Sequence, residues 1–169
     1  MDWLIPQFGF SYIGLIFLLL LFVPNLLWAK NKPEGYDSAE ESRALQRLER
    51  VGEVLVTVMV LSFAALNLRP WSGWSWFLVA AAVCMIFYEG FWLRYFRGGH
   101  TLEDFYGNFC GIPVAGATLP VLAAGCLGLY AQSLWLMLAA AALGVGHIGI
   151  HLKHRKNMNT GPESRKSQD

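Results

Sequence analysis

The stretch 13–23, IGLIFLLLLFV, decides the fold, because it is an uninterrupted apolar run without one charged residue. It lies within the apolar segment 8–28, and a helix needs about 20 such residues to cross the hydrocarbon core of a bilayer. Before the run the chain carries Asp2 and no Lys or Arg, so it lacks the basic start of a signal peptide. We therefore predict an uncleaved transmembrane helix.

The composition indicates that further segments are of the same kind. Hydrophobic residues make up 55% of the chain and charged residues 15%, whereas a soluble domain carries about 25% charged residues. The apolar runs show no period-2 alternation, which argues against barrel strands. The sequence thus predicts an all-α polytopic membrane helix bundle in one domain, 1–156, with about five transmembrane helices over 8–28, 51–68, 75–92, 111–130 and 134–152.

The basic residues alternate between the two sides of these segments. Lys and Arg gather between the first and second segments, between the third and fourth, and after the fifth, whereas the other side carries only Arg69. Since cytoplasmic connections are enriched in Lys and Arg, the N-terminus is expected outside and the C-terminus inside. We expect a protein integral to the membrane, in a bacterial cytoplasmic membrane, with membrane lipids as its surroundings.

Two connections carry helix-start signals. The motifs SAEE at 38–41 and TLED at 101–104 match capping boxes, in which a Ser or Thr side chain and an acidic side chain satisfy each other's backbone N–H groups. After the second motif, apolar residues recur at i, i+3, i+4 and i+7, namely Leu102, Phe105, Tyr106 and Phe109. This spacing predicts a short amphipathic helix in the inner interface. Residues 157–169 are polar and are predicted to form a disordered cytoplasmic tail.

Polar groups inside the spans point to a site, because burying an ionisable residue in a membrane is costly. A rise of about 1.5 Å per residue places Glu89 roughly 7 Å from the inner boundary and Glu53 roughly 5 Å from it. Pro120 cannot donate to the carbonyl of Gly116, and Pro24 likewise frees the carbonyl of Leu20. The predicted pocket opens to the cytoplasm and is lined by Asn25, Glu53, Glu89, Arg94, Gly116 and His147.

Structural roles for these groups remain open at this point. Glu89 is expected to contact His147 or Arg94, either in a functional pocket or in an ion pair that only holds the bundle together. Glu53 could extend to the interface. A neighbouring Thr could satisfy the carbonyls that the prolines free.

A metal site is considered because His147, His151 and His154 recur at i, i+4 and i+7. Two His residues at this spacing can share one metal on a helix, with Glu89 or Asp104 as a further ligand. The HxxxH at the inner end of a late span resembles that of the seven-span ceramidases and adiponectin receptors. This chain has fewer spans and no early His, so the assignment is not transferred. We predict no cofactor and no tightly bound metal.

Three functions fit such a chain. The favoured one is binding or transport of a small polar or amphiphilic molecule, for which Glu89 and His147 could provide proton coupling. The alternatives are an enzyme acting on a lipid or lipid-linked substrate at the inner leaflet, with Glu89 or His147 as general base, and a non-catalytic subunit or assembly factor. Small residues in the last two spans suit a homodimer or a partner membrane subunit. Nucleic acid is not expected as a partner.

Overall fold

The computed structural model describes residues 3–36 and 42–159. Within these ranges the chain forms six α-helices and one 3-10 helix, with no strand beyond isolated bridges, so the all-α prediction is confirmed. The elements are α1 (Tyr12–Lys30), α2 (Arg43–Ser62), η1 (Ala64–Leu66), α3 (Ser75–Arg97), α4 (Leu102–Tyr106), α5 (Ala115–Ala131) and α6 (Leu134–Asn159).

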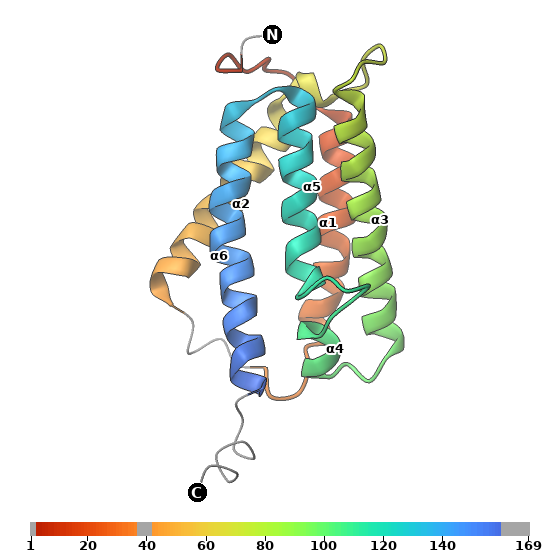
Figure 1. The fold of residues 1–169 in the computed structure, drawn as a ribbon, viewed down its shortest axis with the longest axis vertical. Coiled ribbons are helices and arrows are strands. Elements are labelled where there is room, and N and C mark those ends of the chain that lie inside the picture. Colours follow the sequence, from red (N-terminus) through yellow and green to blue (C-terminus); the bar gives the residue numbers. More distant parts are fainter. Residues whose placement is uncertain (1–2, 37–41, 160–169) are drawn as a thin grey trace, which may run out of the picture.

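The long helices lie side by side along one axis (Figure 1). Successive long helices run in alternating directions, α2 is tilted across the bundle, and the short α4 lies at the end where α6 finishes. The most extensive packing joins α2 to α6, α3 to α5, and α5 to α6, whereas α1 makes fewer contacts.

Some of the predicted spans are long and apolar enough to cross a membrane. In the described ranges, three helices are long and apolar enough to cross a membrane: α1, α3 and the part Leu134–Met158 of α6. Helix α5 is apolar but shorter. Helix α2 does not qualify, because its first half carries Arg and Glu residues. The prediction of a helical bundle with transmembrane candidates is thus confirmed, and the number of crossings remains a proposal.

The predicted end of the second span, at residue 68, is wrong. Helix α2 ends at Ser62 because the segment before α1 takes its last carbonyls: the N–H of Gly9 donates to Ser62 at 2.9 Å and that of Ser11 donates to Leu61 at 3.0 Å. The same pairing delays the first helix, which begins at Tyr12 instead of residue 8. There the Ser11 hydroxyl caps the helix by accepting the N–H of Gly14 at 2.8 Å.

The ends of the last two spans also shift. Helix α5 begins at Ala115, four residues later than predicted, because Phe109 and Ile112 exchange backbone hydrogen bonds of 3.1 and 2.9 Å around a tight turn. Helix α6 continues to Asn159, so the tail predicted for 157–169 begins as helix. The rest of that tail and the motif at 38–41 lie outside the described residues.

The capping box before α4 is confirmed. The Asp104 N–H donates to the Thr101 hydroxyl oxygen at 3.0 Å, and the Thr101 N–H donates to the Asp104 carboxylate at 3.2 Å. The helix is shorter than predicted and its apolar side is buried in the bundle, since Phe105 stacks on Trp28 with ring centroids 5.0 Å apart. Whether α4 lies in the membrane interface remains a prediction.

Glycines allow α2 and α6 to approach until their backbones touch. A Cβ on Gly146 would lie 2.3 Å from the backbone nitrogen of Glu49, and a Cβ on Gly52 would lie 2.5 Å from that of Leu143. Neither backbone can yield as a flexible side chain could, so both positions require glycine. The small residues of α6 at this crossing therefore face α2, while the prediction of a partner subunit stays a prediction.

Candidate functional site

A cavity of about 290 Å³ lies inside the bundle where α1, α2, α3, α5 and α6 converge, and it is open to the surface, since Lys32 and Glu53 in its lining are exposed. Each of the five helices contributes to its polar lining, which includes Asn25, Glu49, Glu53, Tyr88, the backbone of Gly116 and His147, and Lys32 adds to it from the connection after α1. A smaller compartment of about 170 Å³ shares Asn25, Glu49, Gly116 and His147 with it. The structure therefore brings together four of the six residues in the predicted pocket: Asn25, Glu53, Gly116 and His147.

The shortest polar contact in the cavity joins His147 of α6 to Glu49 of α2. Its Nδ1 lies 2.5 Å from the Glu49 Oε1, and both side chains keep about a quarter of their surface exposed, at 28% and 27%. Gly146 makes this pair possible by admitting the backbone of Glu49 against α6. At this distance the imidazole N–H can donate a hydrogen bond to the carboxylate.

Glu49 was missed by the sequence analysis. The predicted second span begins at residue 51, so Glu49 falls just before it. A signal was present, because Glu49 precedes Glu53 by four residues and residues at i and i+4 lie on one face of a helix. Glu53 lines the same cavity from the same face.

Asn25 and Tyr88 form a second polar contact across α1 and α3. The Asn25 amide donates to the Leu21 carbonyl at 2.7 Å and to the Tyr88 hydroxyl at 2.8 Å. The Tyr88 hydroxyl in turn donates to the Leu21 carbonyl at 3.3 Å. Tyr88 is 1% exposed and was also missed, since a tyrosine in an apolar helix is indistinguishable in the sequence from an ordinary core residue.

Two structural features meet at Gly116. A Cβ there would lie 2.7 Å from a ring carbon of Phe91, so glycine lets α5 approach α3. Its carbonyl has no helical N–H partner, because residue 120 is proline. The nearby Thr118 hydroxyl donates to the Pro113 carbonyl at 2.9 Å instead, so this threonine does not satisfy the carbonyl of Gly116. An acceptor is thus left beside the cavity.

Glu89 is not part of this cavity, and its predicted contact with His147 or Arg94 is absent. It lines a separate apolar groove of about 730 Å³ between α1 and α3, and its Oε1 is buried without a hydrogen-bond partner among the described residues. The reason is helical phase. Neighbouring residues point about 100° apart, so the inward position of Tyr88 turns Glu89 away from the interior.

Arg94 is also outside the cavity, where it fastens the connection from α4 to α5. Its guanidinium donates to the carbonyls of Asn108 at 3.0 Å and Asp104 at 2.7 Å. The same group lies over the ring of Phe109, 5.2 Å from the centroid. Arg94 thus holds the backbone of this connection in place. It does not line the cavity, where the sequence analysis predicted it.

Three histidines of α6, His147, His151 and His154, lie among rings toward the C-terminal end of that helix. The rings of His147 and His151 have centroids 4.6 Å apart, and His151 also packs on Phe105 at 5.5 Å. His154 stacks on Tyr106 at 5.4 Å. Over the described part of the chain, no group of three or more His, Cys, Asp or Glu side chains could hold a metal. The arrangement therefore offers hydrogen bonding and aromatic contacts, and the metal prediction stays a prediction.

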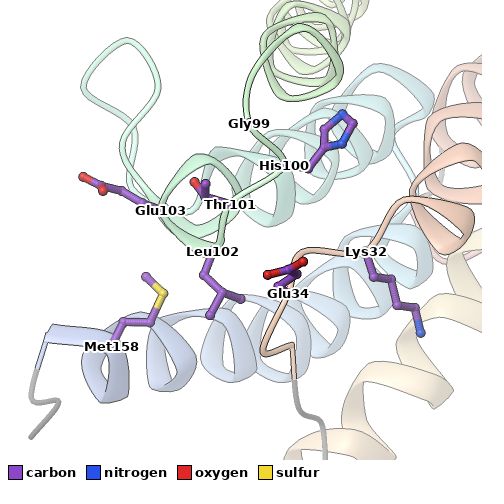
Figure 2. A pocket seen from close by; sticks show the side chains of 8 residues that line it. All are labelled: Lys32, Glu34, Gly99, His100, Thr101, Leu102, Glu103 and Met158. Atoms are coloured by element: carbon purple, nitrogen blue, oxygen red, sulfur yellow. The ribbon is translucent and has the colours of Figure 1, made fainter.

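A depression of about 790 Å³ lies at the end of the bundle where α6 finishes, and Figure 2 shows the side chains that line it: Lys32, Glu34, Gly99, His100, Thr101, Leu102, Glu103 and Met158. The Lys32 side chain points away from Leu102 and Met158. Lys32 also lines the internal cavity. It therefore stands where the inner surface and the cavity meet.

Comparison with known proteins identified no relative of this chain. No protein-family model, no curated protein and no solved structure matches this chain. The function must therefore be argued from the cavity itself.

Proposed function

We propose that the chain is an integral membrane protein that binds a small polar or amphiphilic molecule in the internal cavity, reached from the cytoplasmic end. The observation that carries this proposal is the convergence of polar groups from five helices on one cavity. Such groups are costly inside a membrane and mark functional sites by default. Transport of the same molecule would be an extension of this binding.

The membrane arrangement belongs to the same proposal. Three long apolar helices indicate insertion, and we infer that α2 and α5 cross as well, since both pack against α6. The resulting five crossings place the N-terminus outside and the C-terminus inside, as the distribution of Lys and Arg favours. A bacterial cytoplasmic membrane is the proposed location.

A panel of small molecules tests the proposal. Full-length protein in lipid nanodiscs is heated with amines, amino acids, sugars, carboxylates and lysolipids, and the unfolding midpoint is recorded for wild type, Glu53→Gln and Glu89→Gln. A cavity ligand should raise the midpoint of wild type and of Glu89→Gln, because Glu89 lies in the separate groove. Glu53→Gln should lose much of the increase. If no compound acts, or all three proteins respond equally, the proposal is contradicted.

A further inference from the structure

The smaller compartment combines aromatic walls with a carboxylate. Its lining includes the rings of Trp28, Trp92 and Phe105, the imidazoles of His147 and His151, and Glu49, whose Oε1 contacts the Nδ1 of His147 at 2.5 Å. Trp28 is fixed in place, since Tyr36 meets it edge-on with centroids 5.1 Å apart and Phe105 stacks on it at 5.0 Å. Aromatic faces attract organic cations through the ring quadrupole, and a nearby carboxylate adds charge attraction.

The size of the compartment limits the cation. Its volume of about 170 Å³ is below the roughly 300–1,000 Å³ typical of sites for drug-sized ligands. The larger cavity shares Trp28 and Glu49 with it, so an attached tail or hydroxyl group has room to continue. The recognised group is therefore small, of the size of a substituted ammonium.

An ammonium group of the chain itself, that of Lys32, lies beside two rings of the compartment, Trp28 and Tyr36. The Nζ of Lys32 lies 5.4 Å from the centroid of Trp28 and 5.5 Å from that of Tyr36. The Lys32 side chain is exposed, and among the residues that the structure describes its ammonium group contacts these two rings and no carboxylate within 4.0 Å. Lys32 also stands at the inner mouth of the cavity, on the path that a ligand would take.

We propose that the ligand of the cavity is a small organic ammonium ion, and that the Lys32 side chain occupies part of its site until the ligand displaces it. This inference rests on the proposed binding function. It predicts effects of opposite sign for two changes at the same place. Removing the Lys32 charge should tighten binding, because a tethered competitor is lost. Removing the Trp28 ring should weaken binding, because the cation loses a face.

Choline is a suitable probe, with 3,3-dimethylbutan-1-ol as its neutral counterpart of the same shape. Equilibrium binding of radiolabelled choline is measured on full-length protein in nanodiscs at constant ionic strength. Wild type should bind choline, and the neutral alcohol should compete at least about tenfold less well. Lys32→Met and Lys32→Gln should each tighten binding by about fivefold, and Trp28→Leu should weaken it by a similar factor. Lys30→Met removes a charge outside the cavity lining and should leave the affinity unchanged.

The possible failures are distinct. Equal competition by the neutral alcohol, or weaker or unchanged binding in both Lys32 variants, would overturn the ammonium proposal. If choline and other amines do not bind while a neutral or acidic compound of the panel does, the ammonium proposal fails and the binding function stands. If nothing in the panel binds, the proposed function itself fails.

Discussion

Gly146→Ala tests whether close approach of α2 and α6 builds the site. The added Cβ would meet the Glu49 backbone nitrogen at 2.3 Å, and ordinary contact begins near 3.4 Å, so the helices must separate by about 1.1 Å. The Glu49–His147 contact of 2.5 Å would then lengthen toward 3.6 Å, beyond hydrogen-bond distance. Forcing an extra carbon into such packing costs about 1–3 kcal/mol. The unfolding midpoint should fall by roughly 2–10 °C.

Gly125→Ala is the matched control. Gly125 also lies within a helix, but a Cβ there would meet nothing within 4 Å. Replacing a helical glycine by alanine with free space should stabilise the protein by up to about 1 kcal/mol. Thermal unfolding of both variants in one detergent gives the comparison. Equal midpoints for Gly146→Ala and wild type would refute the close crossing and, with it, the placement of Glu49 in the cavity.

Three other predictions concern contacts around the bundle. Tyr88→Phe removes an acceptor of the Asn25 amide and should cost about 1 kcal/mol in denaturant unfolding, with no further loss when Asn25 is already Leu. Thr101→Ala should cost about 1 kcal/mol at neutral pH through the lost cap. The Thr101 backbone N–H, and then its hydroxyl, lower the pKa of Asp104 below its ordinary 3.8. The stabilisation from these hydrogen bonds to the carboxylate is therefore present above about pH 4 and is lost as the pH falls through the lowered pKa. The unfolding midpoints of wild type and Thr101→Ala should converge in acid. Arg94→Gln should speed amide hydrogen exchange in the connection from α4 to α5, and unchanged exchange there would contradict its anchoring role.

Much of the fold could be predicted from composition, because long uncharged apolar runs leave few alternatives to spanning helices. The helix ends could not. Helix α2 stops at Ser62 because residues far away in the sequence, Gly9 and Ser11, donate to its last carbonyls. Such tertiary partners leave no local trace in the sequence.

The sequence predicts the position of each polar residue along its helix, but not the side of the helix on which the residue lies. Counting residues from the boundary grouped Asn25, Glu53, Gly116 and His147, which line one cavity in the structure, since depth follows directly from helical rise. The side of the helix on which a residue lies depends on the neighbours of that helix, which a single sequence does not reveal. Glu89 was therefore assigned to the interior, although the structure places it in a groove between α1 and α3.

Access to the cavity from the cytoplasmic side is the most direct test of the account. Leu143 lines the cavity one helical turn before His147, and Leu19 is exposed on the outside of α1, with 54% of its surface accessible. With the native cysteines Cys84, Cys110 and Cys126 replaced, Leu143→Cys and Leu19→Cys are treated with a membrane-impermeant thiol reagent on inverted or sealed vesicles of known orientation. Leu143→Cys should react from the cytoplasmic side alone, whereas Leu19→Cys should stay unmodified within the bilayer. Protection of Leu143→Cys from that side, or labelling from the opposite side, would contradict the central claim.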